Sequence, residues 1–158
     1  MNIIEYDNKY IEDVKDLLVE LEEYIVSIDK DNLDIVSSDY RDKMFEYDLS
    51  NSDICYIAVD NNKAIGLIIG KIRKYDEVDY LDYRCPKMGI ITELIVTNKV
   101  RGKGIGKLLI SKIHEYFKDK DCEYVIVDVF NYNDNGIKFY LNNGYHTRMI
   151  TMINKIDI

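Results

Sequence analysis

Apolar residues recur along the chain with two different spacings, and each spacing predicts a different element. Between residues 11 and 28 they recur every three or four positions, which predicts one face of a long amphipathic helix. Residues 3–6, 54–60 and 89–96 are short runs rich in β-branched residues, which are typical of strands. The apolar runs therefore predict a protein that mixes helices with a sheet.

The rest of the chain continues this alternation of strands and helices. Residues 64–75 return from the strand at 54–60 as a hairpin partner after the turn DNNK, and residues 73–87 form a polar, acidic and aromatic arm. The remaining elements are expected to be a helix from Ser37 or Ser38 to about Asp48, a helix whose apolar face includes Ile105 and Phe117, a strand at 123–130, a short helix at 133–141 and a last strand at 145–156. The order β-α-α-β-β-β-α-β-α-β predicts one α/β (α+β) domain over residues 1–158, with a mixed central sheet flanked by helices.

Charge and composition exclude several classes of protein. The net charge of −8 argues against nucleic-acid binding, which needs a basic face. An acidic surface favours the binding of cationic small molecules, or only keeps the protein soluble. The cysteines Cys55, Cys85 and Cys122 form no CxxC pair, which predicts a reducing compartment and no metal site. No signal peptide opens the chain, and no apolar run approaches the roughly 18–20 residues of a membrane span. We therefore expect a cytoplasmic protein that binds neither nucleic acid nor membrane.

A glycine-rich segment, VRGKGIGK, begins at Val100 and leads directly into an amphipathic helix. Such loops bind phosphate because the N–H groups at a helix N-terminus have no intrahelical acceptor and the helix dipole favours anions there. A Walker loop is excluded, because Gly106-Lys107 is followed by Leu108 and not by Ser or Thr. A dinucleotide fingerprint requires GxGxxG and a later acid; the spacing here is GxGxG, although Asp128 stands near the acid's position. A dinucleotide-binding protein remains an alternative.

The loop resembles the acetyl-CoA-binding loop of the GNAT superfamily of N-acetyltransferases. Residues 101–106, RGKGIG, fit that family's [RQ]xxGx[GA] signature, and the preceding ELIVTNKV resembles the strand that leads into its loop. The resemblance implies that acetyl-CoA is a co-substrate whose pantetheine pairs with the backbone of this strand. The residues that it implies for cofactor binding are Leu94, Ile95, Val96, Arg101, Gly102, Lys103, Gly104, Ile105, Gly106, Lys107, Asn133 and Tyr140.

A second motif of the same family lies further along the chain. NDNGIKFY at 133–140 and the glycine-tyrosine pair after it resemble the family's NxxAxxxYxxxGF, with Gly136 in place of Ala and Tyr145 in place of Phe. The close resemblance covers about residues 89–146, whereas the N-terminal half agrees only in the order of its elements. Tyr140 matches the motif tyrosine, which implies a general acid that protonates the leaving thiolate. The alternative for Tyr140 is a tyrosine that only packs in its helix.

The reaction that the resemblance implies is direct transfer of an acetyl group to a primary amine, which must be neutral to attack. Glu93 and Asp128 each stand alone in an apolar strand, and a carboxylate there must face water, a partner or a substrate. Both are candidate general bases, acting directly or through a water. The alternative for each is an exposed strand residue or a salt-bridge partner without a catalytic role. Asn133 either binds the cofactor, caps the following helix, or does both.

The acceptor is predicted to be a small cationic amine, either a polyamine or a compound like an aminoglycoside. Acids and tyrosines in the first two helices and in the 73–87 arm suit such a cation, although a solvated helix face and a polar loop explain them too. These residues are Glu22, Glu23, Tyr24, Asp29, Asp76, Glu77, Asp79, Tyr80, Asp82 and Tyr83. The alternatives are an acetyltransferase of protein N-termini or lysines and a non-catalytic sensor of acyl-CoA. The family also implies a homodimer, in which the last strand would be a contact.

Overall fold

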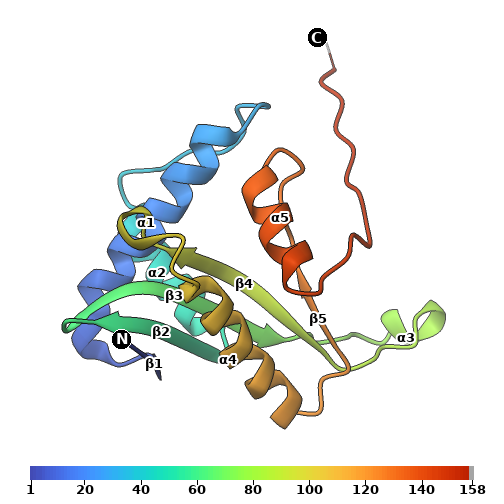
Figure 1. Cartoon of the computed structure of the whole chain (residues 1–158). Coiled ribbons are helices and arrows are strands. Elements are labelled where there is room, and N and C mark those ends of the chain that lie inside the picture. Colours follow the sequence, from blue (N-terminus) through green and yellow to red (C-terminus); the bar gives the residue numbers. More distant parts are fainter. Residues whose placement is uncertain (157–158) are drawn as a thin grey trace. The chain divides into compact units, whose positions relative to one another are not determined.

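The computed structural model describes residues 1–156 and divides the chain into two compact units (Figure 1). The first unit, Met1–Asp128, contains the whole sheet and the helices that pack on it. The second unit begins at Val129 and contains one helix followed by an irregular segment. No helix within residues 1–156 is long and apolar enough to cross a membrane.

The sheet of the first unit is mixed and follows the order of the chain. Its strands are β1 (Asn2–Glu5), β2 (Ile54–Asp60), β3 (Lys63–Ile72), β4 (Met88–Val96) and β5 (Tyr124–Val127). Neighbouring strands are antiparallel from β1 to β4, and β5 runs parallel to β4. The strands expected at 54–60 and 89–96 are confirmed. The strand expected at 123–130 is shorter, so Asp128 lies just beyond its end.

Helices α1 (Ile11–Ile28) and α2 (Tyr40–Ser50) pack on one face of the sheet. The apolar stripe predicted between residues 11 and 28 is the buried face of α1, where Val14 and Leu18 are fully buried against Leu67 of β3. Burying a side chain of this size stabilises a fold by roughly 1.5–3 kcal/mol. The core on this face is therefore built mainly by one helix and the central strands.

Helix α4 (Ile105–Asp119) covers the opposite face of the sheet, in front of the strands in Figure 1. Its residues Leu109, Ile113 and Phe117 are buried there. Because successive side chains of a strand alternate between faces, the neighbours of Leu67 in β3 face α4 instead of α1. Both faces of β2, β3 and β4 are thus covered, which explains why these strands are apolar almost throughout.

The arm between β3 and β4 is ordered by its own turns. It contains the short helix α3 (Asp79–Asp82), and the Tyr75 hydroxyl donates to the Pro86 carbonyl at 2.7 Å. The Asp79 carboxylate accepts a hydrogen bond from the Asp76 N–H, and the Asp76 carboxylate accepts one from the Val78 N–H. Two of the acids that the sequence suggests for acceptor binding therefore hold the shape of the arm.

The second unit contains α5 (Asp134–Asn142), which confirms the predicted short helix. The prediction of a strand at 145–156 is wrong: this segment has no regular secondary structure, and apolar side chains such as Met149 and Met152 are exposed. A strand needs a neighbouring backbone to satisfy its hydrogen bonds, and apolar composition alone does not supply one. Within residues 1–156 the order therefore ends in β-α.

Candidate functional site

The glycine loop joins β4 to α4 after a short 3₁₀ turn at Asn98–Val100. Gly102 and Gly104 have φ angles of 81° and 78°, a left-handed conformation that residues with a Cβ rarely adopt. Gly104 is the N-cap of α4 and has no side chain to cap it, so the first N–H groups of the helix lack intrahelical acceptors. Lys103 and Lys107 are exposed at the same end. This helix N-terminus is therefore suited to bind an anion.

Arg101 ties the loop to the rest of the first unit. Its Nε donates to the Val96 carbonyl at 2.9 Å, and its Nη2 lies 3.8 Å from Glu20 Oε1 of α1. Its guanidinium also lies 5.5 Å from the centre of the Tyr24 ring. Glu20 in turn accepts a hydrogen bond from the Asn98 N–H at 2.7 Å. Arg101, a predicted cofactor-binding residue, thus has three contacts within the chain that position the loop.

Strand β4 continues beyond its pairing with β5. The ladder between the two strands ends at the pair Ile91–Val127, although β4 runs on to Val96. On the other side, the register of β3 and β4 shifts between Ile69 and Gly70, so that Thr92 is an extra residue in β4. No other strand within residues 1–156 pairs with the far end of β4 on its β5 side. This edge of the backbone is open for a ligand to pair with.

The open edge presents the N–H groups of Leu94 and Val96, whereas the Val96 carbonyl on this side accepts the hydrogen bond from Arg101. The Thr97 N–H donates to the Ile65 carbonyl at 3.0 Å, which places the backbone groups of Thr97 on the β3 side. Backbone groups alternate in direction along a strand, so the N–H groups of Leu94 and Val96 point to the other, open side. Ile95 turns its N–H toward β3, and its side chain is 3% exposed in the core. Of the three residues predicted to meet pantetheine, two present an N–H at the open edge.

Glu93 precedes these residues on β4 and faces α1 and α2. It lies opposite Ile69, a member of the core on that face, and its side chain is half-buried. Burial raises its pKa to about 8 from the usual value of 4.5, and the charges of Asp48 and Glu22 contribute to the increase. The isolated acid that the sequence pattern singled out is therefore a carboxyl group that titrates close to neutral pH.

Asp48 is a site residue that sequence reasoning missed. It is 8% exposed, and its Oδ2 has no hydrogen-bond partner within residues 1–156. Burial raises the pKa of Asp48 to about 6; Lys71 opposes this increase and Glu22 adds to it. One indication was present in the sequence, because Asp48 follows Phe45 by three residues and so falls on the helix face that packs on the core. An acid at such a core position is unusual.

Tyr40 and Glu22 complete an acid cluster, by which we mean Glu22, Tyr40, Asp48 and Glu93. The Tyr40 hydroxyl donates to Glu22 Oε2 at 3.2 Å and so links α2 to α1. Burial raises the pKa of Glu22. Burial and the negative charges of Glu22, Glu93 and Asp48 also raise the pKa of Tyr40. In the described residues, no three or more His, Cys, Asp or Glu side chains converge closely enough to hold a metal ion. The cluster is thus a set of separate carboxylates around one phenol.

The other predicted residues lie elsewhere in the described chain. Tyr140 and Asn133 belong to the second unit, where the Tyr140 ring packs edge-on against Phe139 and Tyr145 at 5.3 Å between centroids. The Asn133 side chain accepts a hydrogen bond from the N–H of residue 136 at 2.9 Å, which confirms its capping role. Asp128 is exposed just after β5, and its charge does not contribute to the raised pKa of Glu93.

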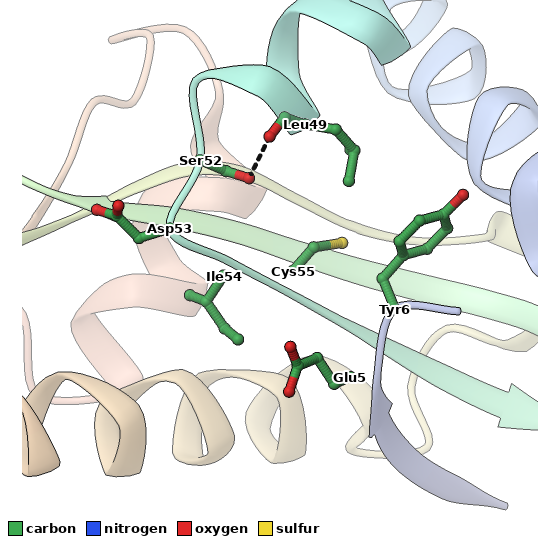
Figure 2. Close-up of a pocket in the computed structure, with 7 residues that line it drawn as sticks. All are labelled: Glu5, Tyr6, Leu49, Ser52, Asp53, Ile54 and Cys55. Atoms are coloured by element: carbon green, nitrogen blue, oxygen red, sulfur yellow. Dashed lines mark hydrogen bonds between the residues drawn. The ribbon is translucent and has the colours of Figure 1, made fainter. Parts of the chain in front are cut away.

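A separate pocket of about 150 Å³ lies where β1, β2 and the end of α2 meet (Figure 2). It is lined by Glu5, Tyr6, Leu49, Ser52, Asp53, Ile54 and Cys55. Ser52 Oγ donates to the Leu49 carbonyl at 3.0 Å, and burial raises the pKa of Cys55 to about 12, which keeps it a thiol. None of the residues predicted from the sequence lines this pocket.

Comparison with known sequences identifies related proteins. Residues 17–145 match the sequence model of the acetyltransferase (GNAT) family. N-alpha-acetyltransferase 30 from Xenopus laevis is 26% identical over 111 residues, which cover 70% of this chain and 38% of the relative. The human and mouse proteins of the same name are 25% identical over 111 residues. The chain thus aligns with well under half of the length of the curated relatives it matches.

Solved structures share the fold over the whole chain. A mutant of the BH1408 protein from Bacillus halodurans superposes with a TM-score of 0.81 at 22% identity, over 99% of both chains. The aminoglycoside N-acetyltransferase AAC(6')-Iy in complex with CoA superposes with a TM-score of 0.71 at 16% identity, over 99% of this chain and 100% of that one. At these identities the likeness establishes the fold alone.

Proposed function

This chain belongs to the acetyltransferase (GNAT) family, and we propose that it transfers the acetyl group of acetyl-CoA directly to a primary amine. We expect a small cationic acceptor, either a polyamine or a compound like an aminoglycoside. The observation that carries the proposal is Glu93, a half-buried acid with a pKa of about 8 that immediately precedes the open edge of β4. A general base is most effective when its pKa lies near the working pH.

The residues around the glycine loop fit acetyl-CoA. The N-terminus of α4, with Gly102, Gly104 and the two exposed lysines beside them, would hold the pyrophosphate. The open N–H groups of Leu94 and Val96 would pair with pantetheine as an added strand does. When bound, acetyl-CoA supplies the acetyl group as an activated thioester. An N–H at the open edge would donate to the thioester oxygen as negative charge develops there.

Three side chains have proposed roles in proton transfer. Glu93 would accept the proton of the acceptor ammonium, directly or through a water, because its raised pKa makes it a stronger base than an ordinary carboxylate. Asp128 is the second candidate for this base. Tyr140 would return a proton to the leaving sulfur; a phenol has a pKa of about 10 and a thiol about 8.5, so this step requires help from the site.

The acid cluster supports a cationic acceptor, since carboxylates in a half-buried position bind ammonium groups strongly. One of the similar solved structures is AAC(6')-Iy in complex with the bisubstrate analogue CoA-S-monomethyl-acetylneamine. The identity of 26% to N-alpha-acetyltransferase 30 favours a second candidate, acetylation of protein N-termini. In that case Asp128 becomes the preferred base.

The proposal is tested by measuring the release of free thiol from acetyl-CoA with a panel of amines. Polyamines, aminoglycosides, amino acids and short peptides are compared, and product masses are checked. We expect turnover with the polycations; turnover with peptides alone would select the second candidate. Binding of CoA without turnover of any amine would contradict acetyl transfer and favour an acyl-CoA sensor. Light scattering after gel filtration tests the homodimer, and binding of CoA but not NAD excludes the dinucleotide-binding alternative.

Replacing Gly104 by alanine is expected to weaken CoA binding about tenfold. The left-handed φ of 78° costs a residue with a Cβ about 1–2 kcal/mol, so the loop relaxes and turns its N–H groups away from the phosphates. Calorimetric titration of CoA measures the change. Gly144→Ala is the matched control, because Gly144 has a φ of 87° but lies outside the loop. Equal CoA affinity of Gly104→Ala and the wild type would remove the loop from the binding site.

A further inference from the structure

The acid cluster holds more negative charge than the chain neutralises around it. Among the described residues, Glu22, Asp48 and Glu93 form no ion pair with a lysine or arginine, and Lys71 is the only cation that lowers the pKa of any of them. Asp34 adds further negative charge beside Glu22. Half-buried carboxylates must be protonated or matched by a positive charge. The arrangement therefore leaves a deficit of positive charge at this position.

Asp48 is the most deeply buried member of the cluster. Its side chain is 8% exposed and Oδ2 has no donor within residues 1–156, whereas Glu22 and Glu93 are only partly buried. A buried acceptor without a donor costs roughly 1–3 kcal/mol, and more when it carries a charge. An ammonium group from a ligand, entering past the less buried acids, would supply the missing hydrogen bond and charge together.

The spread of the carboxylates indicates what kind of cation fits. Glu22 and Asp48 are close enough to Glu93 for their charges to raise its pKa, and Glu22 also raises the pKa of Asp48. Within the described residues the carboxylates nevertheless do not converge as metal ligands do. At neutral pH Glu93 is largely protonated, because its pKa is about 8. Glu22 and Asp48, opposed by Lys71, still leave at least one negative charge, which the second ammonium group of a diamine would neutralise. An organic dication can place its two ammonium groups at separate acids, which a metal ion cannot do.

We propose that Asp48 is a specificity-determining residue that binds the second ammonium group of a diamine acceptor, beside Glu22 held by Tyr40, while Glu93 receives the proton of the amine to be acetylated. The inference rests on the proposed acetyl transfer. The ammonium group that reacts loses one proton to Glu93, and its nitrogen bonds to the acetyl carbon as the carbon–sulfur bond breaks. The nitrogen then releases a second proton, which balances the proton that the sulfur of CoA takes up. The second ammonium keeps its charge throughout.

The test compares diaminobutane with butylamine, which have the same carbon chain and differ by one ammonium group. In the wild type we expect kcat/KM to favour the diamine by roughly 30-fold or more, and Asp48→Asn to reduce that preference at least tenfold, since every 1.4 kcal/mol corresponds to a factor of ten. Glu46→Gln, an exposed acid on the same helix, is the matched control and should keep the wild-type preference. Lys71→Met removes the competing cation and should increase the preference.

The possible outcomes separate this inference from the proposed function. Equal rates of the wild type on both amines, or an unchanged preference in Asp48→Asn, would overturn the diamine subsite while leaving acetyl transfer intact. If no amine is acetylated, the proposed acetyl transfer is wrong. Calorimetric titration of diaminobutane into the protein with CoA then tests whether the diamine subsite exists. Binding that Asp48→Asn weakens and Glu46→Gln does not would support the subsite, and no binding to the wild type would overturn it.

Discussion

Glu93→Gln is expected to lower kcat/KM for the amine acceptor by roughly 10²–10⁴-fold, the usual contribution of a general base. Glutamine keeps the shape of the side chain but cannot accept a proton at neutral pH. The rate of the wild type should rise with pH through about 8, where Glu93 loses its proton, and the variant should lack that rise. Thiol release measured across this range gives both results. The titration of the amine itself remains in both proteins and serves as the internal reference.

The same variant tests the raised pKa without any substrate. Because the pKa of Glu93 in the folded protein lies above its usual 4.5, the folded state binds more protons than the unfolded state between these two pH values. Stability should therefore fall as pH rises from about 5 to about 8, and glutamine should remove this loss. We expect the Tm of Glu93→Gln to exceed that of the wild type by a few degrees at high pH; about 1 kcal/mol corresponds to roughly 2–4 °C for a chain of this size.

A difference in Tm that stays the same from acid to alkaline pH would contradict a raised pKa at Glu93. Glu46→Gln removes an exposed acid, so its difference in Tm from the wild type should not grow with pH. If the Tm difference widens as expected but activity is unchanged, Glu93 is a buried acid without a role in proton transfer, and Asp128→Asn becomes the next variant to measure.

Tyr140→Phe is expected to lower kcat by roughly 10²-fold, at the lower end of the range for general acid catalysis, and to change the KM for acetyl-CoA by no more than about twofold. The substitution removes one hydroxyl but keeps the ring that packs against Phe139 and Tyr145. The fold of α5 should therefore be preserved. Steady-state kinetics at saturating amine separates the two parameters.

Tyr145→Phe is the matched control for this prediction. It removes a hydroxyl from the ring that packs against Tyr140, so an equal loss of kcat in both variants would point to altered packing rather than to proton transfer. Unchanged turnover in Tyr140→Phe would remove Tyr140 from the mechanism and leave the thiolate to depart without a protein acid.

Much of the fold and part of the candidate site were predictable from local patterns. The stripe of apolar residues that includes Val14 and Leu18 predicted α1, and the apolar runs predicted β2 and β4. The glycine spacing located the turn in which Gly102 and Gly104 have positive φ. These features depend on residues within one or two turns of each other.

The errors and omissions concern contacts between distant parts of the chain. The segment 145–156 is apolar enough for a strand but pairs with no strand among the described residues. Arg101 remains a predicted cofactor-binding residue, but the sequence did not indicate the contacts of its guanidinium with Val96, Glu20 and Tyr24. Asp48 was overlooked because an acidic residue in a helix is expected to be exposed unless the packing of that helix shows otherwise.

The sequence by itself determined the family, the order of most elements and the position of the glycine-rich loop, because periodicity, glycine content and motif spacing are local properties of the chain. Only the tertiary structure decided which carboxylates meet. Glu22, Asp48 and Glu93 come from α1, α2 and β4, and their raised pKa values arise from burial and from the charges of neighbouring carboxylates. Both effects depend on removing water by packing distant segments together, which no local pattern encodes.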